Sequence, residues 1–278
     1  MAPILLNTIP ESASGYTLKT YKGERFSLPL HQHEKYEFTW IVKGEGTRII
    51  GDNISSFVKD DILLLGPKLP HQWQSEPNLC REVEAISLFI EKDYLGHQFW
   101  KNPSTRHLTQ ILNLTSRGLI IHNNLKTKLM QLFKMLKTAS QGRGMIIVLD
   151  MLQSISESND FEPLCSPGYC IPVNVDSSGI GKVTDYILQH IQEKLSVSEL
   201  SEIACMHPNS LSREFRRMTG FSIVEYINKI RIGNAVRYLR ETNATVLDIC
   251  YRCGFQNLSN FNRQFKKVMG CSPSRYRK

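Results

Sequence analysis

The sequence of 278 residues predicts a two-domain chain of the β + α class. Three observations predict it: residues 16–90 alternate short apolar runs with turn residues, residues 182–278 show helical periodicity almost throughout, and the excess positive charge is confined to that second region. We expect a β-barrel with a helical pair over residues 1–160, a linker over 161–181 and an all-α domain over 182–278.

Composition limits the class further. The chain is 41% apolar and 22% charged, which excludes disordered and collagen-like classes. No apolar run approaches the roughly 20 residues of a membrane span, and the first twelve residues lack the pattern of a secretory signal, so we expect a cytoplasmic protein. Seven scattered cysteines are an odd number, and we expect them to be reduced.

The first predicted domain begins with short strands. Turn residues at Gly44, Gly46, Gly51 and the pair Asp52-Asn53 separate the apolar or alternating runs between residues 16 and 90. This spacing is typical of a small antiparallel barrel or sandwich.

A change of period marks the helical pair. Apolar residues follow one helical face over residues 122–157, at Leu125, Leu129, Leu132 and Leu136, and a second apolar helix follows from Met145. Such a pair serves equally well for internal packing and for a homodimer interface. Residues 158–181 hold three Pro and three Gly without periodicity, which is typical of a linker.

The charge of the last hundred residues indicates a polyanionic partner. Residues 182–278 contain 16 Lys and Arg against 8 Asp and Glu, a net charge of +8, whereas residues 1–181 contain 34 − 16 = 18 basic and 26 − 8 = 18 acidic residues. Clustered positive charge favours binding to phosphates because it releases condensed counterions. A solvated basic surface explains the charge alone equally well.

An internal repeat gives this charge a structure. "LSREFRRMTGFSIVEY" at 211–226 aligns with "FNRQFKKVMGCSPSRY" at 261–276, and the offset of fifty residues is constant. The pairs Arg213/Arg263, Phe215/Phe265, Gly220/Gly270, Ser222/Ser272 and Tyr226/Tyr276 coincide. Each copy therefore predicts a helix that ends at a glycine cap.

A second short helix precedes each copy. Ser196 with Glu199 forms a capping-box pattern, and Thr245 with Asp248 forms a weaker acidic version. Breaks before Pro208 and at Gly254 end these helices. Together with buried faces at Leu211, Phe215 and Met218 in one copy and Phe261, Phe265 and Val268 in the other, the pattern predicts two helix-turn-helix units.

The opposite face of each second helix carries side chains suited to nucleic acid. Asn, Ser and Arg match the hydrogen-bonding groups of base edges, and Lys and Arg match phosphates. An exposed polar face is the alternative for each single residue. The candidate DNA-binding residues are Asn209, Ser212, Arg213, Arg217, Ser259, Asn260, Asn262, Arg263 and Lys266.

Residues 222–242 between the units predict one amphipathic helix, with Ile227, Ile230, Val236 and Leu239 turned inward. About 20 residues span about 30 Å. Major-groove faces on one side of B-DNA repeat at about 34 Å, so this helix places the two units near a matching separation.

The first domain has its own candidate site. His31, His33 and Glu37 project from one face if the strand is extended, and His71 follows later. Three imidazoles and a carboxylate suit a divalent transition metal, whereas a ligand pocket or barrel scaffold explains them without one. We expect no metal, and we assign His31, His33, Glu37, Trp40, His71 and Trp73 to an effector pocket.

Residues 182–278 resemble the DNA-binding domain of AraC-type transcriptional regulators. The motifs "SELSEIA", "LSREFRRMTG", "IRIGNAVRYL", "ICYRCGF", "FNRQFKK" and "CSPSRYR" carry the resemblance. It implies that Asn209, Ser212, Arg213, Ser259, Asn262 and Arg263 read the groove. Cys250 and Cys253 depart from the family pattern; their CxxC spacing suggests a metal or redox site, but Cys250 falls where a small buried residue is needed.

The spacing H-x-H-x3-E-x6-G, ending at Gly44, is similar to the cupin barrel signature. Gly66 and Lys68 depart from the later half of the enzymatic cupin pattern, and the domain resembles instead the sensor barrel of AraC-type regulators.

The resemblance implies a sequence-specific DNA-binding transcriptional regulator, an activator by family default, that responds to a small-molecule effector in its cupin-like barrel. We expect double-stranded DNA, a small-molecule effector and RNA polymerase as partners, a homodimer, no cofactor and no enzymatic activity. The alternatives are a cupin-type metalloenzyme fused to a DNA-binding module and an architectural DNA protein.

Overall fold

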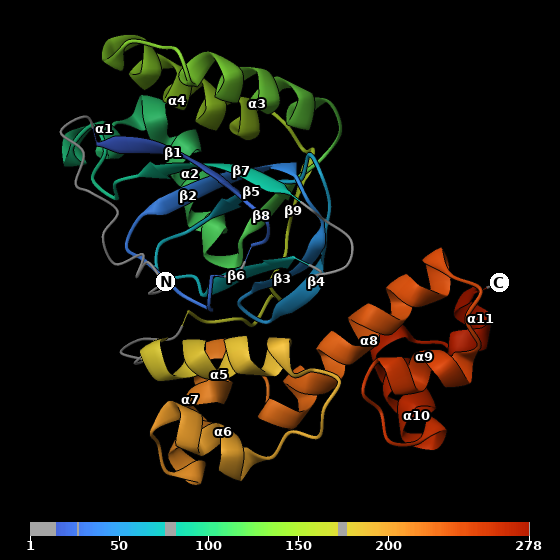
Figure 1. Ribbon diagram of the computed structural model, residues 1–278. Coiled ribbons are helices and arrows are strands. Elements are labelled where there is room, and N and C mark those ends of the chain that lie inside the picture. The colour runs from blue at the N-terminus through green and yellow to red at the C-terminus, as the bar shows by residue number, and fades with distance from the viewer. Residues whose placement is uncertain (1–14, 27, 76–81, 172–176, 278) are drawn as a thin grey trace. The chain divides into compact units, whose positions relative to one another are not determined.

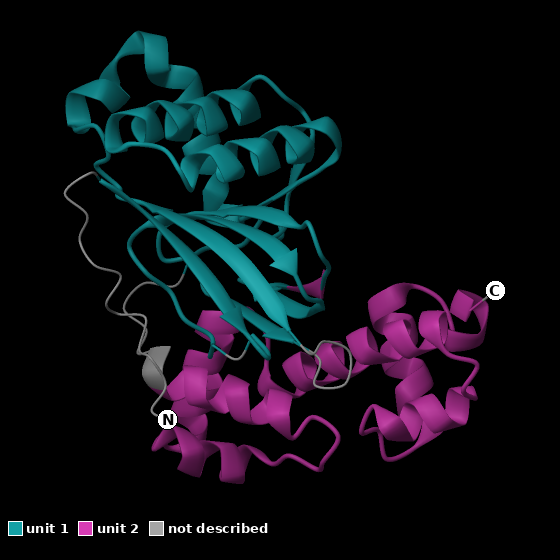
Figure 2. Ribbon diagram, turned by 45° about the horizontal axis from the view of Figure 1, so that its top comes forward, with its two compact units in different colours: residues 1–53, 57–172 teal, residues 54–56, 173–278 magenta. Residues whose placement is uncertain are grey.

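The computed structural model describes residues 15–26, 28–75, 82–171 and 177–277. Residues 1–53 with 57–172 form one compact unit, and residues 173–278 with 54–56 form the other (Figure 2). The first unit is rich in antiparallel β-sheet and the second is helical, so the predicted β + α class is confirmed. Some positions with predictions lie outside the described residues. They are the first fourteen residues, where we expect no secretory signal, Cys80, and positions 172–176 of the predicted linker.

The first unit is built on two antiparallel sheets (Figure 1). The larger sheet has the order β1-β7-β2-β5-β8-β9 and the smaller has the order β4-β3-β6. The described strands form two sheets rather than one closed ring. The larger sheet comprises β1 Tyr16–Gly23, β2 Tyr36–Lys43, β5 Ile62–Leu65, β7 Val83–Ile90, β8 Leu119–Ile121 and β9 Phe161–Pro163, and the smaller comprises β3 Gly46–Ile50, β4 Asn53–Phe57 and β6 His71–Ser75.

The two faces of the larger sheet pack against different partners. In β2, Phe38 and Trp40 face a cluster under the helices, whereas Ile41 joins a second cluster with residues of the smaller sheet. Strand geometry gives this alternation because successive side chains point to opposite faces. The helices of this unit are α1 His97–Lys101, α2 Arg106–Leu114, α3 Asn123–Leu136 and α4 Gln141–Ser156, with single turns η1 Pro103–Thr105 and η2 Thr115–Arg117.

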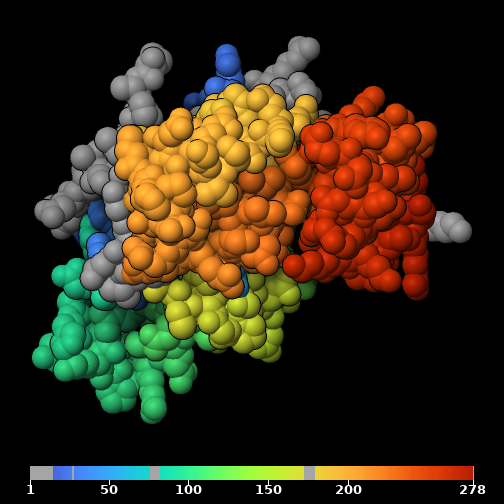
Figure 3. Space-filling view, turned by 90° about the horizontal axis from the view of Figure 1, so that it is seen from below, coloured from blue at the N-terminus to red at the C-terminus, as the bar shows by residue number. Residues whose placement is uncertain are grey.

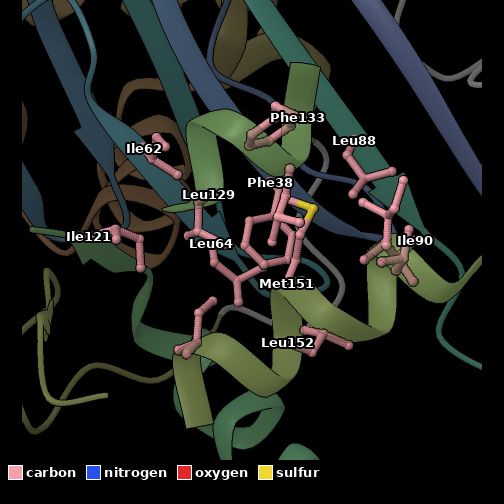
Figure 4. Packing of buried hydrophobic residues seen from close by; sticks show 14 of the residues in the cluster. Phe38, Ile62, Leu64, Leu88, Ile90, Ile121, Leu129, Phe133, Met151 and Leu152 are labelled. Atoms are coloured by element: carbon pink, nitrogen blue, oxygen red, sulfur yellow. The ribbon is translucent and has the colours of Figure 1, made fainter. Parts of the chain in front are cut away.

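Helices α3 and α4 form the predicted pair and cover the larger sheet. All four leucines of the predicted stripe in α3 are buried, and they pack with Phe133, Met151 and Leu152 over Phe38 and Leu64 (Figure 4). The sequence analysis did not predict α1 or α2, although Asn102-Pro103 marks a turn between them and α2 buries Leu108, Ile111 and Leu112 on one face.

The predicted linker begins inside the first unit. Phe161–Pro163 forms edge strand β9 beside β8, and the Cys165 side chain is buried with its sulfur 3.2 Å from the carbonyl oxygen of Ile50. An edge strand tolerates Pro163 because one side of its backbone needs no ladder partner. The prolines and glycines of residues 158–181 therefore led to a linker prediction where the short strand β9 forms. At the other end, α5 already starts at Ser177.

The second unit contains the two predicted helix-turn-helix units, each with a short helix, a turn and a longer helix. The first is α6–α7 and the second is α9–α10, and α8 connects them (Figure 1). Helix α5 precedes the first unit and α11 follows the second. Their bounds are α5 Ser177–Gln189, α6 Val197–Ala204, α7 Pro208–Thr219, α8 Ile223–Glu241, α9 Val246–Arg252, α10 Leu258–Met269 and α11 Pro273–Arg277.

Helix α8 buries two different faces, where the sequence suggested one inward stripe. Its first half buries Ile223, Tyr226, Ile227 and Ile230, and its second half buries Ile232, Ala235 and Leu239. At about 3.6 residues per turn these sets lie on roughly opposite sides of the helix. Val236, which we predicted to face inward, is only partly buried. The helix thus serves two small cores at once.

Caps fix the helix ends. Gly220 and Gly270 end α7 and α10 at φ 78° and 75°, as predicted. The capping boxes differ from prediction. Ser196 accepts a hydrogen bond from the Glu199 amide, but the Glu199 carboxylate binds the Tyr186 hydroxyl instead of closing the box. The weaker pattern, Thr245 with Asp248, forms the full capping box.

The ends of α7 and α10 differ in their cover. Met218 is fully buried, whereas its repeat equivalent Val268 is 38% exposed, so the predicted burial of Val268 is wrong. After Gly220 the chain continues as the nineteen-residue α8, whereas after Gly270 it forms only the five-residue α11. The shorter helix leaves less apolar surface to cover position 268.

Cys250 and Cys253 are core residues. Neither forms a disulfide, they are 0% and 1% exposed, and they pack with Ile249 and Phe255. Burial raises the pKa of the Cys250 thiol. Among the described residues, no helix has the length and apolar character that crossing a membrane requires.

Gly254 and Gly270 give a stability prediction. Both have positive φ, but a Cβ at Gly254 would lie 2.6 Å from the Ile191 carbonyl oxygen, whereas a Cβ at Gly270 would meet nothing within 4 Å. We expect Gly270→Ala to lower the free energy of unfolding by about 1 kcal/mol and Gly254→Ala by about 3 kcal/mol or more. Urea denaturation followed by circular dichroism measures both. Equal losses would contradict the close approach at Gly254.

Candidate nucleic-acid interface and ligand cavity

Helix α7 presents the first set of candidate DNA-binding residues. Pro208 occupies the first turn, and Nδ1 of His207 accepts a hydrogen bond from the Asn209 amide at 3.3 Å, which caps the helix start. Phe215 anchors the other face against Tyr226, with ring centroids 5.0 Å apart. The predicted residues of this helix are all exposed: Asn209, Ser212, Arg213 and Arg217.

Helix α10 repeats this arrangement. The Asn257 side chain accepts a hydrogen bond from the Asn260 amide at 2.8 Å and caps the helix start. Phe261 and Phe265 are fully buried. The predicted residues Ser259, Asn262, Arg263 and Lys266 are exposed.

Asn260 differs from the other candidates. It is partly buried, and its Oδ1 accepts a hydrogen bond from Arg263 at 3.0 Å and one from Gln264 at 3.5 Å. In this geometry Asn260 orients the Arg263 guanidinium. A direct base contact by Asn260 stays a prediction.

Glu214 holds the arginines of α7. Its carboxylate lies 3.3 Å from Nε of Arg213 and 3.0 Å from Nη1 of Arg217. The Arg213 side chain is 71% exposed, so water weakens its ion pair with Glu214. The repeat equivalent of Glu214 is Gln264, which leaves the basic side chains of α10 without a neighbouring carboxylate at that position.

The sequence analysis missed three residues of these surfaces. His207 and Asn257 lie just before the recognition helices, where N-cap residues are expected, so the signal was present. Glu214 stood between two arginines in "SREFRR" and was read only as part of the charge count.

In the first unit, three histidines and one glutamate converge. The ligand-capable nitrogens of His31, His33 and His71 lie within 4.8 Å of one another. Glu37 is buried, and its Oε2 lies 2.8 Å from Nε2 of His33 and 3.2 Å from Nε2 of His71. The predicted extended strand over residues 31–37 is wrong in detail. The chain bends at Glu34 and Lys35 before β2, and His31 instead bridges to His71.

The rings are oriented by main-chain carbonyls. Nδ1 of His31, His33 and His71 lies 2.9, 3.1 and 2.8 Å from a carbonyl oxygen two residues away. Because a carbonyl only accepts hydrogen bonds, each Nδ1 carries its proton. The Nε2 atoms of His33 and His71 face the Glu37 carboxylate, and all three rings keep Nε2 available as a possible metal ligand. The donor set therefore fits a divalent transition metal, held by the three imidazoles with Glu37, which would act there as a Lewis acid.

Burial and hydrogen bonding set the charges of this cluster. Burial alone would raise the pKa of Glu37, but hydrogen bonds and charge from His33 and His71 hold that pKa well below its usual range. Burial, followed by the charge of His71, lowers the pKa of His31 to about 3, so this ring is neutral near pH 7. The cluster thus combines a carboxylate with at least one neutral imidazole.

A cavity of about 270 Å³ lies beside the cluster. His31, Glu37 and Trp73 from the predicted pocket contribute to its wall. The cavity is mainly apolar, with Lys19, Thr20, Thr39 and Ser87 as further polar groups. Its apolar lining residues are Tyr21, Phe26, Leu28, Ile41, Trp73, Ala85 and Phe89.

The remaining predicted pocket residues lie elsewhere. His33 and His71 contact Glu37 but do not line this cavity. Trp40 faces the opposite side of β2 and packs against Phe133, with ring centroids 5.9 Å apart. It stands three positions after Glu37, and an odd separation along a strand places two side chains on opposite faces.

Comparisons with known proteins agree on the helical unit. The family model of a helix-turn-helix domain matches residues 200–278. The chain is 25% identical over 256 residues to the transcriptional activator RhaR of Mannheimia succiniciproducens, covering 90% of this chain and 87% of that protein. It is also 35% identical over 111 residues to the bifunctional transcriptional activator and DNA repair enzyme AdaA of Bacillus subtilis, covering 39% of this chain and 53% of AdaA.

Solved structures include similar chains. The DNA-binding domain of AdpA in complex with a target DNA is 28% identical, covers 36% of this chain with 89% of its own length, and has a TM-score of 0.35. ToxT from Vibrio cholerae O395 is 16% identical, covers 95% of this chain with 97% of its own length, and has a TM-score of 0.38.

The matched residues include both recognition helices, α7 and α10, with their caps and exposed polar faces. The motifs at these positions are those of AraC-type proteins. Residues 200–278 therefore form a helix-turn-helix domain of the AraC type, and the chain is a DNA-binding transcriptional regulator.

Proposed function

We propose that α7 and α10 enter successive major grooves of one DNA duplex and read a bipartite operator. The observation that carries this proposal is the repeat itself. Two capped helices, one on each side of α8, present equivalent exposed residues, and Arg213 and Arg263 occupy the same position in each copy. Asn and Arg side chains read base edges in the major groove, which an architectural DNA protein does not need.

The length of α8 supports reading of two grooves. Its nineteen residues span about 28 Å at about 1.5 Å per residue. Successive grooves on one side of DNA lie about 34 Å apart, which is close to this length.

We infer that the first unit binds a small-molecule effector in the cavity beside Glu37. An apolar wall with a few polar groups is typical of a site for a small, largely apolar ligand that carries one or two hydrogen-bonding groups. Trp73 Nε1 is buried and has no hydrogen-bond partner among the described residues, so it suits a ligand acceptor. Effector binding then shifts the populations of DNA-competent arrangements.

A homodimer through α3 and α4 belongs to this proposal. Met135 near the end of α3 and Met145 and Ile146 near the start of α4 are 46%, 39% and 51% exposed. These apolar side chains lie near the turn that joins the two helices, while the opposite helix faces pack on the sheet. The exposed set supports an interface between two copies.

Activation through contact with RNA polymerase is also a proposal. The relative RhaR is named as a transcriptional activator, and it aligns with 90% of this chain. The alternative of a cupin-type metalloenzyme finds no support in this relative. AdaA is named as a DNA repair enzyme as well as an activator, and the chain covers only 53% of it.

The experiment that tests the function is selection of bound duplexes from a random pool by the full-length protein. The proposal predicts an enriched sequence with two conserved elements about one helical turn apart. Enrichment of a single short element, or no enrichment, would contradict it.

The two repeat-equivalent arginines give a mutational prediction. Arg213→Ala and Arg263→Ala should each weaken binding to the selected operator by about 1 to 3 kcal/mol, because each removes a bidentate base contact. Each should relax sequence preference in one element only, as measured by titration of operators with single base changes. Lys266→Ala is the control, since loss of a phosphate contact weakens binding to all sequences alike. Unchanged preference in both arginine variants would reject the assigned roles.

The ion pairs of Glu214 predict that its neutralisation raises the affinity for DNA. Glu214→Gln makes α7 match α10 at this position, removes the ion pairs that Glu214 forms with Arg213 and Arg217, and removes a negative charge near the phosphates. We expect tighter binding to operator and to non-specific DNA, with the larger gain at low salt, because the change acts through charge. Titrations at two salt concentrations measure it. Weaker operator binding would show that Glu214 has a positive role in recognition.

The two tryptophans of β2 and β6 give a test of the cavity. A metabolite that stabilises the protein in a thermal screen should change the intrinsic fluorescence through Trp73, which lines the cavity. Trp73→Phe should abolish most of that change, whereas Trp40→Phe should retain it because Trp40 packs against Phe133 on the opposite face. The reverse result would place the ligand under the helices instead.

A further inference from the structure

Reading of two grooves, on which this inference rests, needs a fixed relation between α7 and α10. Helix α8 connects the units, yet its end segments alone do not fix how each unit is rotated about it. Figure 3 shows the two halves of the helical unit as adjacent lobes. We call α5, α6 and α7 (yellow to orange) the first lobe and α9, α10 and α11 (red) the second lobe. Contacts between these lobes beside α8 would define their relative orientation.

Arg231 makes such contacts from the middle of α8. Its Nε donates a hydrogen bond to the carbonyl oxygen of Ile191 at 2.8 Å, and its Nη2 donates one to the carbonyl oxygen of Glu193 at 2.6 Å. Both acceptors lie just after α5, in the first lobe. Carbonyls after a helix end lack intrahelical partners, and hydrogen bonds from a guanidinium to them are among the stronger kinds.

The second lobe touches the same segment. The turn between α9 and α10 contains Gly254, where a Cβ would lie 2.6 Å from the Ile191 carbonyl oxygen and 2.8 Å from Cα of Gln192. This backbone approach is closer than any side chain allows. It joins the second helix-turn-helix unit directly to the end of α5.

Phe255 completes the contact. Its ring is buried in the core of the second lobe with Phe261 and Ile249, and the Arg231 guanidinium carbon lies 5.8 Å from the ring centroid. One arginine therefore contacts the main chain of the first lobe and an aromatic core residue of the second. Residues 191–193, Arg231, Gly254 and Phe255 form what we call the junction.

We propose that the junction sets the relative orientation of the two DNA-reading units and thereby the spacing of operator elements that the protein accepts. Arg231 is its positioning residue: it contacts no base and acts through the placement of α7 and α10. An aliphatic side chain at position 231 removes both hydrogen bonds and leaves two carbonyls without their partner. The lobes then stay folded but rotate more freely about α8.

The test uses full-length Arg231→Met, Arg231→Lys and the wild type. The duplexes are the operator selected by the wild type, each of its two elements alone, and operators with one or two base pairs inserted between the elements. We expect Arg231→Met to bind the full operator about tenfold or more weakly, because the second element no longer benefits from a high effective concentration. Binding to each element alone should change less than about twofold, since neither recognition surface is altered.

The readout is the loss of affinity when base pairs are inserted between the two operator elements. A general loss of protein stability would not change this ratio. The wild type should lose much of its affinity when base pairs are inserted, and Arg231→Met should lose a smaller factor. Arg231→Lys keeps the positive charge and one hydrogen bond but loses the two-pronged guanidinium. Its loss of affinity on insertion should therefore lie between those of the wild type and Arg231→Met. Lys182→Met is the matched control, because it removes one positive charge from an exposed position in α5, just as Arg231→Met removes one from α8. It should have the spacing preference of the wild type.

The outcomes separate this proposal from the proposed function. If the wild type selects no bipartite operator, reading of two grooves fails. If it does, and Arg231→Met shows the wild-type penalty for inserted base pairs, only the junction fails. Parallel loss on the single elements would mean that Arg231 supports the fold of one reader or contacts DNA, which overturns the positioning role. If Arg231→Met does not fold, Arg231→Lys decides between the same outcomes.

Discussion

The helical unit depends on one constraint: α8 belongs to two hydrophobic cores. Ile223, Tyr226 and Ile230 pack toward the first helix-turn-helix unit, and Ile232, Ala235 and Leu239 pack on the roughly opposite face toward the second. A helix is stiff over this length, so α8 holds the two cores a fixed distance apart along its axis, while in our proposal the junction around Arg231 sets how far one unit is turned from the other. Each reader therefore needs only two helices of its own.

Repetition in the sequence does not produce identical halves. The first copy has α5 before it and the long α8 after it, whereas the second has α8 before it and only α11 after it. The difference is visible at single positions. Met218 is buried and Val268 is exposed, and the Tyr276 hydroxyl accepts a hydrogen bond from Arg240, whereas the Tyr226 hydroxyl is buried without a partner among the described residues. Glu214 in α7 against Gln264 in α10 adds a difference in charge at the surfaces that we propose contact DNA.

Sequence alone predicted what depends on local periodicity and caps. The leucine stripe of α3 and the buried phenylalanines of α7 and α10 follow the period of a single helix. The glycine ends of α7 and α10 follow from local backbone conformation, and the fifty-residue repeat is visible by direct alignment. Sequence alone failed where the outcome depends on tertiary partners. Whether Glu199 closes a capping box depends on Tyr186, which competes for its carboxylate, and whether residues 161–163 form a strand depends on the free edge of β8. The histidine cluster was recognised by residue type, but the bend before β2 brings its members together by a route that an extended strand does not describe.

The two alternating faces of the larger sheet separate the cavity from the helices that cover the sheet. Glu37, Thr39 and Ile41 face the cavity, while Phe38 and Trp40 face α3 and α4. A ligand that moves β2 would thus act directly on the helices that carry the exposed Met135 and Ile146. If the proposed effector site and the proposed homodimer interface are both correct, the larger sheet is the physical link between them within the first unit.

The most direct test of the central claim is a hydroxyl-radical footprint of the protein on its selected operator. Simultaneous reading by α7 and α10 predicts two protected clusters on one face of the duplex, separated by about 10 base pairs, with one cluster lost in each of two variants altered at Arg213 or Arg263. A single cluster that either variant abolishes entirely would mean that the two helix-turn-helix units do not occupy neighbouring grooves.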